Sequence, residues 1–230
     1  MWYMSSKRHT VTGYTLRAAS AVGGVFVLCL GIALSVKTEL GMGTFDGMSA
    51  TIADVLGMKI GTFSIIINFS LIICQILIEG KSFSRLQLLQ FPNVLLCGTV
   101  LNFFTYTVFG SLRIESYLLR LLISALSNVI RAAGVMMILE SDIVRSAMEG
   151  LVQLVCERRN WRLGRAMMVM DAVYIAVSLS LSLIFKTPYR IREGTVIAML
   201  MFGPCLDIIR KPVKKIKGHF GVKEEQRSAV

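Results

Sequence analysis

Charged side chains are scarce in this sequence. Only 17% of its 230 residues are Asp, Glu, Lys or Arg, whereas 54% are hydrophobic and the mean hydropathy is +0.66. A soluble domain carries roughly 25% charged residues, so the composition excludes an ordinary soluble protein and indicates a membrane protein. The net charge of +11 does not indicate nucleic-acid binding, because the basic residues lie between apolar runs, where they act as topology signals.

Residues typical of catalytic and metal sites are also few. The two histidines, His9 and His219, lie in the polar ends of the chain, and no His, Cys or Asp cluster has the spacing of metal ligands. The five cysteines are an odd number without a pairing pattern, which argues against a disulfide framework. We therefore expect no enzyme, no metal site and no cofactor.

One segment, 31–61, occurs twice. An ungapped offset of 103 residues superposes it on 134–164 and keeps three glycines, three acids and one base in register. The pairs are Gly31/Gly134, Gly47/Gly150, Gly61/Gly164, Glu39/Asp142, Asp46/Glu149, Asp54/Glu157 and Lys59/Arg162. We interpret this as an internal duplication. Beyond residue 164 the offset becomes 105, since Lys186 and Gly203 match Lys81 and Gly98.

Apolar runs recur along the chain at lengths suited to a bilayer, which needs about 20 helical residues. The runs are 18–36, 60–78, 88–109, 117–139, 166–185 and a shorter one at 195–209. A cleaved signal peptide is the alternative for the first run, but it is long for that role and more runs follow. We expect an all-α polytopic membrane protein with about six transmembrane helices. Its parts are a basic head (1–17), a first three-helix repeat (18–109), a second (110–209) and a basic tail (210–230).

Three spans per repeat determine the relation of the two halves. A unit with an odd number of spans ends on the opposite side of the membrane, so its copy inserts upside down, as in many secondary transporters. A cytoplasmic N-terminus places 17 basic residues on the inner side and seven on the outer side. This bias predicts that both termini are cytoplasmic. Lys186, Arg190 and Arg192 are exceptions on the outer side.

The repeat also predicts where polar groups meet. Asp46 matches Glu149, Asn68 matches Asp171, and Asn102 matches Asp207 at the offset of 105. An ionised side chain at a helix centre costs about 2.5–3.5 kcal/mol, so such residues face a partner, water or a solute. Our candidates for a substrate or ion pathway between the repeats are Asp46, Asn68, Arg131, Glu149, Asp171 and Asp207.

Arg131 lies on a polar stripe of the fourth span. Arg120, Ser124, Ser127 and Asn128 share its helix face at steps of three, four and seven residues. Asp171 has a similar depth on the next span, which predicts an Arg131–Asp171 pair. Such a pair either holds two helices together or lines a solute path.

The loops after spans one and four carry unusual patterns. Gly41 and Gly43 precede Thr44 and a short amphipathic pattern, so a broken or re-entrant helix would begin there with free N–H groups suited to an anion. Alternatively, Asp46 and Glu149 only cap helices, since Ser146-x-x-Glu149 is a capping box. A phosphate loop is not indicated, because no Lys-Ser/Thr follows the glycines.

Three motifs of the first half resemble a known family. Gly-Ile-Ala-Leu-Ser-Val-Lys at 31–37, Leu-Gly-x-Gly-x-x-Asp-Gly at 40–47 and Leu-Gly-x-x-Ile-Gly-Thr at 56–62 resemble the YczE/YyaS/YitT group of bacterial integral membrane proteins. The sequence departs from it at Thr44-Phe45, where the group has a Pro-aromatic pair, and at Val144 and Ser146, which replace the glycines in the second copy. The resemblance implies a multi-pass protein of the bacterial plasma membrane and no settled substrate.

Two function classes remain open. The first is a small secondary carrier of an unknown small solute, with its site between the repeats. The second is a non-transporting accessory or regulatory membrane subunit, in which the polar pairs serve assembly; a lipid-handling protein is a third outcome. The expected partners are the lipid bilayer and a solute, without nucleic acid, and a homo-oligomer or another membrane protein is compatible with both classes.

Overall fold

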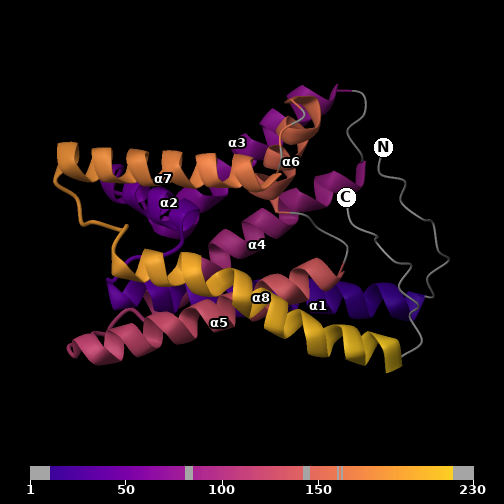
Figure 1. Cartoon of the computed structure of the whole chain (residues 1–230), viewed down its shortest axis with the longest axis horizontal. Helices are drawn as coiled ribbons and strands as arrows, with labels where there is room; N and C mark the ends of the chain where they lie inside the picture. Colours follow the sequence, from indigo (N-terminus) through magenta and orange to yellow (C-terminus); the bar gives the residue numbers. More distant parts are fainter. Residues whose placement is uncertain (1–10, 81–84, 142–145, 160, 162, 220–230) are drawn as a thin grey trace.

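The computed structural model describes residues 11–80, 85–141, 146–159, 161 and 163–219, and the described part is helical, without a strand (Figure 1). The first half contains α1 (Val11–Thr38), α2 (Thr44–Val55), α3 (Ile60–Glu79), the 3-10 turn η2 (Arg85–Leu89), α4 (Gln90–Asn102) and its π-helical continuation η3 (Phe103–Val108). The second half contains α5 (Tyr117–Ser141), α6 (Ala147–Arg159), α7 (Leu163–Phe185) and α8 (Glu193–His219). The expected short helices after spans one and four are confirmed as α2 and α6.

Within the described residues, five helices are long and apolar enough to cross a membrane. They are Arg17–Thr38, Ile60–Glu79, Gln87–Val108, Tyr117–Leu139 and Gly164–Phe185. The expected sixth span, 195–209, lies in α8, whose apolar part Glu193–Leu206 is shorter than the others. Large apolar side chains such as Leu77, Met168 and Leu200 are exposed on these helices, as lipid-facing residues are. The chain is therefore a polytopic all-α membrane protein.

The helix order repeats with the offset found in the sequence. A long, a short, a long and a further helix follow each other in both halves, and α6 begins at 147, which is 103 residues after the start of α2 at 44. Likewise, α7 begins at 163, which is 103 residues after the start of α3 at 60. The two copies of the duplicated segment thus form the same series of elements.

α1 and α5 lie side by side (Figure 1), and glycines lie at their contact. A methyl group on Gly31 would lie 2.6 Å from Arg131 Cγ and 2.9 Å from Ser127 O. A methyl group on Gly134 would lie 2.7 Å from Leu28 Cα and 2.8 Å from Gly24 O. These contacts are reciprocal, since Gly134, Arg131 and Ser127 each follow Gly31, Leu28 and Gly24 by 103 residues. They also show that the two helices are antiparallel, and small residues permit the close approach.

The remaining packing is mostly reciprocal too. α2 packs on α7 and α6 on α3, while α4 packs on α1 and α8 on α5. One contact differs between the halves: a methyl group on Gly61 of α3 would lie 2.1 Å from Gly98 O of α4, whereas Gly164 of α7 has no described atom within 4 Å of the same position. That the two halves are related by a half-turn about an axis in the membrane plane stays a prediction.

Candidate functional site

The N-terminus of α2 lies inside the helix bundle. Thr44 Oγ1 donates a hydrogen bond to Asp171 Oδ1 of α7 at 2.5 Å, and Thr51 Oγ1 lies 2.7 Å from Ser178 Oγ two turns later. Both pairs are separated by 127 residues, so α2 and α7 run in the same direction. Asp171 is the ninth residue of the 23-residue helix α7. The short helix therefore begins near the middle of a span and runs towards the end of that span.

The chain reaches this depth by turning back beside the end of α1. Glu39 has φ 55° and Gly41 has φ 100°, and the latter conformation is readily adopted only by glycine. Ser35 Oγ donates to Gly41 O at 3.3 Å, so the returning chain stays against α1. Gly41 thus lies in the turn before α2, while the anion-binding role expected for the glycines there stays a prediction.

An Arg–Asp pair occupies the start of α2. Arg131 Nη2 of α5 donates to Asp46 Oδ2, and the two side chains are only 11% and 23% exposed. Gly43 is the N-cap residue without a side-chain cap, and a methyl group there would lie 2.9 Å from Arg131 Nη2. Glycine thus allows the guanidinium to lie against the backbone at the start of α2.

One aromatic ring lies beside Arg131, and two more belong to residues near Thr44 and Asp171 in the chain. The ring of Phe202 in α8 lies 5.7 Å from Arg131 Cζ, within the range of a cation–π contact. Phe45 and Tyr174, next to Thr44 and one turn after Asp171, meet edge to face at 5.5 Å. We call Gly43, Thr44, Asp46, Arg131 and Asp171 the central cluster.

The central cluster has two carboxylates and one guanidinium. Asp46 pairs with Arg131, whereas the described contact of Asp171 is to the neutral hydroxyl of Thr44. With both carboxylates ionised, the formal charge of the cluster is one negative. The uncapped N-terminus of α2 adds a partial positive charge, so charges of both signs face each other within a few ångströms.

A polar row on α5 leads away from Arg131. Ser124 and Asn128 are 0% and 1% exposed, and Ser124 Oγ, Asn128 Oδ1 and Arg131 Nε have no hydrogen-bond partner among the described residues. A methyl group on Gly194 of α8 would lie 3.0 Å from Ser124 Oγ. A buried polar group left unpaired costs about 1–3 kcal/mol, so this row could bind a polar molecule.

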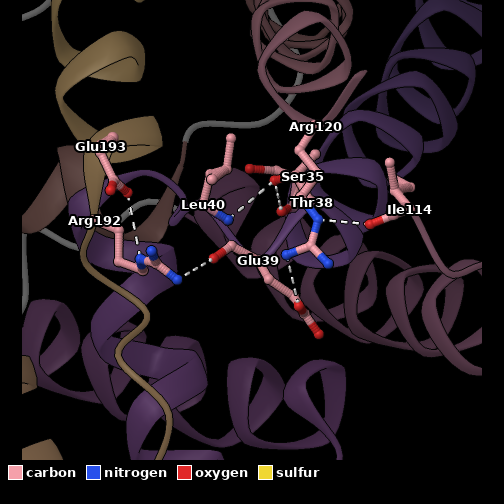
Figure 2. A network of polar contacts seen from close by, with 8 residues as sticks. All are labelled: Ser35, Thr38, Glu39, Leu40, Ile114, Arg120, Arg192 and Glu193. Carbon is pink, nitrogen blue, oxygen red and sulfur yellow. Dashed lines mark hydrogen bonds and ion pairs between the residues drawn. The ribbon is translucent and has the colours of Figure 1, made fainter. Parts of the chain in front are cut away.

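Near the N-terminal end of α5, the loops before α2 and α8 are joined by polar contacts, which we call the outer network. Figure 2 shows Glu39 between two arginines: Arg120 Nη1 lies 3.0 Å from Glu39 Oε2, and Arg192 Nη1 donates to Glu39 O at 3.3 Å. Arg120 Nε also donates to Ile114 O at 2.6 Å, and Arg192 Nε lies 3.3 Å from Glu193 Oε2. Glu39 therefore connects the turn before α2 to both α5 and the loop before α8.

Arg190 completes the outer network. Its Nε and Nη2 lie 2.7 and 3.1 Å from the two carboxylate oxygens of Asp54 near the end of α2. Its carbonyl accepts from Met42 N at 3.3 Å, and Gly194 N donates to Leu40 O at 2.7 Å. A pocket of about 360 Å³ lies here, lined by Ser35, Val36, Glu39, Gly41, Met42, Pro188, Tyr189, Arg190 and Arg192.

The structure brings together some of the candidates from the sequence and separates others. Asp46, Arg131, Asp171, Gly43 and Thr44 meet in the central cluster. Asn68 lies apart in α3, where its amide donates to Ser64 O of the same helix at 2.8 Å. The side chains of Glu149 and Asp207 lie outside the described part of the structure.

The expected Arg131–Asp171 pair is wrong. Arg131 pairs with Asp46, and Asp171 instead accepts from Thr44. The expectation compared the depths of the long spans only. Because α2 enters the bundle beside α7, its first turn supplies a carboxylate nearer to Arg131. Asp46 thereby has an ion-pair partner in addition to its place in the first helical turn.

Sequence reasoning also missed residues of the outer network. The Arg190–Asp54 and Arg120–Glu39 pairs were not expected, although both acids belong to the repeated segment. The sequence did contain one indication of these pairs. Arg120 and Arg190 are basic residues predicted on the outer side, against the charge bias, and such residues need an acidic partner nearby. The acids of segment 31–61 are the natural candidates. The rings of Phe45, Tyr174 and Phe202 left no comparable signal in an apolar sequence.

The sequence is similar to known proteins over most of its length. A family model described as a family of unknown function (DUF6198) matches residues 15–211. The uncharacterized protein YyaS of Bacillus subtilis (strain 168) is 22% identical over 192 residues, which cover 84% of this chain and 91% of YyaS. No solved structure matches. The resemblance to YyaS is confirmed, whereas the wider grouping with YczE and YitT stays a prediction.

Proposed function

This chain belongs to the DUF6198 family, a family of unknown function, and we propose that it is a small secondary carrier whose solute binds at the central cluster. It is a multi-pass membrane protein by its apolar helices. In the proposal it lies in the plasma membrane of a bacterium with both termini in the cytoplasm. The solute is small and polar, and its site lies between the first-half helix α2 and the second-half helices α5, α7 and α8.

The observation that supports this proposal best is the half-helix with charges at its inner end. Discontinuous helices whose N-termini point at a central site are typical of secondary transporters. Here, the N-terminus of α2 carries Thr44 and Asp46, which contact Asp171 and Arg131. Three ionisable side chains inside a membrane domain are costly to maintain, and a solute pathway is the usual reason for them.

The reciprocal contacts between the halves support the same proposal. The Gly31–Arg131 and Gly134–Leu28 contacts make the α1–α5 crossing equivalent from both sides. An antiparallel pair of equivalent helices at the centre is what an inverted repeat requires. Such repeats place the binding site near the bilayer midplane at their interface, and in the proposal the central cluster is this site.

The pocket at the outer network and the polar row of α5 support it as well. The pocket of about 360 Å³ includes Gly41 and Met42, which directly precede the central cluster in the chain. The unpaired groups of Ser124, Asn128 and Arg131 follow one face of α5 from the outer network inward. A polar solute would find hydrogen-bonding groups along this face in an otherwise apolar bundle.

Access to the central cluster tests the proposal. In a variant without the five native cysteines, Thr44→Cys is labelled in intact membranes with a membrane-impermeant methanethiosulfonate reagent added to one side at a time. A carrier exposes this position to water, so we expect labelling from at least one side. Ala50→Cys on the same helix, at 0% exposure, is the control that stays unlabelled. A Thr44→Cys as inert as the control from both sides contradicts the carrier and favours the accessory subunit.

Solute movement requires a second measurement. Cells that produce the protein, and cells that produce Arg131→Met at the same membrane level, are compared for the small polar molecules inside and outside the cells. We expect the wild type alone to change the distribution of at least one solute. Equal profiles for wild type, variant and empty cells would contradict transport under the conditions used, whatever the labelling result.

A further inference from the structure

The two short helices sit at different depths against their long partners. In the first half, Thr44 at the start of α2 contacts Asp171 of α7. In the second half, the equivalent residue, Ala147 at the start of α6, accepts a hydrogen bond at 2.5 Å from Gln75 of α3. By the repeat offset of 103, Gln75 corresponds to Ser178 and not to Asp171. Gln75 Oε1 also lies 3.1 Å from the Cβ position of Gly150. Relative to the Thr51–Ser178 contact, α6 is therefore four to seven residues, or about 6–10 Å at 1.5 Å per residue, shallower than α2.

The deeper position on α3 carries a polar residue that this structure does not use between helices. Asn68 is the repeat equivalent of Asp171 and the ninth residue of the 20-residue helix α3. Its amide nitrogen donates to Ser64 O and lies 3.4 Å from Ser64 Oγ, both within its own helix. Thus α3 offers polar partners at Asn68 and Gln75, and α7 offers them at Asp171 and Ser178, with the same spacing of seven residues.

The packing of the helices also differs between the two ends of the bundle. At the end where α2 leaves the bundle, the outer network holds α2 through Asp54 and Arg190, and α3 and α4 touch at Gly61 and Gly98. At the opposite end, the repeat equivalent of Gly61 is Gly164, which has no described atom within 4 Å of its Cβ position. The deep short helix thus coincides with tight packing at one end and the shallow one with looser packing at the other.

We propose that this structure is one of two states that exchange these registers. In the other state, α2 moves outward by one to two turns so that Thr44 approaches Ser178, and α6 moves inward so that Ala147 approaches Asn68. The outward movement separates Asp46 from Arg131 and opens the outer network. The inference rests on the proposed function, because it gives the central cluster access to each side in turn, and it assigns Asn68 as the partner of α6 in the second state.

Pairs of cysteines test the exchange in native membranes. In a variant without the native cysteines, Thr51→Cys/Ser178→Cys and Gln75→Cys/Ala147→Cys report the observed registers. Thr44→Cys/Ser178→Cys and Asn68→Cys/Ala147→Cys report the other state. A disulfide requires Cα atoms within about 7 Å, and the seven residues between the observed and the other-state partner of each short helix correspond to about 10 Å, which exceeds this limit. We expect copper phenanthroline to cross-link all four pairs, with the first two dominant.

Weakening the outer network sharpens the test. Asp54→Asn removes the charge that holds Arg190 near the end of α2, so the yields of both other-state pairs should rise together, by about fivefold if the ion pair contributes about 1 kcal/mol. Glu193→Gln is the matched control, because it breaks an exposed pair with the adjacent Arg192 that does not involve α2. The control should leave all four yields unchanged.

The outcomes separate this inference from the proposed function. If neither other-state pair exceeds its single-cysteine controls, even with Asp54→Asn, the asymmetry is fixed and the inference is overturned, while the labelling of Thr44→Cys still decides the carrier. A rise in only one of the two pairs also overturns it, because the registers then do not exchange. If both rise but Thr44→Cys remains unlabelled, the exchange stands and the carrier proposal fails.

Discussion

α2 and α6 occupy equivalent places in the chain, and among the described residues the polar cluster lies at the start of α2. Thr44 of α2 corresponds to Ala147 of α6, so the hydroxyl that contacts Asp171 has no equivalent in the second half. On the long helices the difference is reversed. Arg131 of α5 corresponds to Leu28 of α1, and Asp171 of α7 corresponds to Asn68 of α3. The polar groups have therefore been divided between the two copies.

This division accounts for the single Arg–Asp pair that the described residues form at the start of a short helix. The central cluster needs the short helix of the first half and the long helices of the second half. The converse combination, α6 against α1 and α3, has Ala147, Leu28 and Asn68 at the places of Thr44, Arg131 and Asp171. Glu149 stands at the place of Asp46, but Leu28 offers that carboxylate no basic partner. Equivalent helices thus cross symmetrically at Gly31 and Gly134, and a few differing residues place the Arg131–Asp46 pair on one side of this crossing.

The largest expected effect follows from breaking the buried pair. Arg131→Met leaves Asp46 buried without its partner, which costs about 3–5 kcal/mol. Leu28→Met is the matched control at the equivalent position of α1 and should cost less than about 1.5 kcal/mol. Both are measured as the loss of monodisperse protein on heating in a mild detergent. We expect a large decrease in midpoint temperature for Arg131→Met alone.

The double variant Arg131→Met/Asp46→Asn tests whether the unpaired Asp46 carboxylate causes the loss of stability in Arg131→Met. Since it removes both charges, it should recover much of the stability and remain without activity if the pair lines the solute path. Equal midpoints for Arg131→Met and Leu28→Met would show that the ion pair does not stabilise the bundle, and the comparison between the halves would lose its main contrast.

The second effect concerns the contact that differs between the halves. A methyl group on Gly61 would meet Gly98 O at 2.1 Å, so Gly61→Ala must separate α3 from α4 and should cost about 1–3 kcal/mol. Gly164→Ala meets no described atom within 4 Å and improves helix propensity by up to about 1 kcal/mol. The same heating assay should lower the midpoint for the first and leave or raise it for the second. Equal destabilisation would indicate that α7 and α8 pack as closely as α3 and α4.

The sequence was sufficient to predict the helices but not all of their contacts. Apolar runs and the repeated glycines located five spans and both short helices, because hydrophobic length and the repeat offset are local properties of the chain. The sixth run was expected to be shorter than the others, and the apolar part of α8, Glu193–Leu206, is shorter. Burial of Arg131 and Asp171 in the bundle followed from the cost of charge in lipid.

Partner choice depended on information that the sequence does not carry locally. The depth of α2 decides that Asp46, and not Asp171, pairs with Arg131, and this depth results from the turn at Glu39 and Gly41 and from the Thr51–Ser178 contact. Neither feature changes the hydropathy of the segment. The misplaced Arg190 was visible in the charge bias, but its partner Asp54 could be identified only once α2 was placed.

A smaller effect tests what holds α2 at its depth. Thr51→Val keeps the shape of the side chain and leaves Ser178 Oγ without the partner that now lies 2.7 Å away. We expect a loss of about 1–3 kcal/mol, partly recovered in Thr51→Val/Ser178→Ala, and a lower yield of the Gln75→Cys/Ala147→Cys cross-link, which reports the same state. Additive single effects in this double-mutant cycle would contradict a direct contact between the two hydroxyl groups.

Asn68→Leu should have the smallest effect on stability, and it tests the comparison between α2 and α6 most directly. The hydrogen bonds of the Asn68 amide stay within α3, so replacing it by leucine in a membrane span should change the midpoint by less than about 1 kcal/mol. If Asn68 contacts α6 in a second state, Asn68→Leu removes the polar partner of α6 in that state. The Thr44→Cys/Ser178→Cys yield should then fall, because α2 and α6 exchange together. Ser70→Ala, which removes an exposed intrahelical hydrogen bond of the same helix, should leave that yield unchanged. A clear loss of stability with an unaltered yield would instead make Asn68 a structural residue of the observed state.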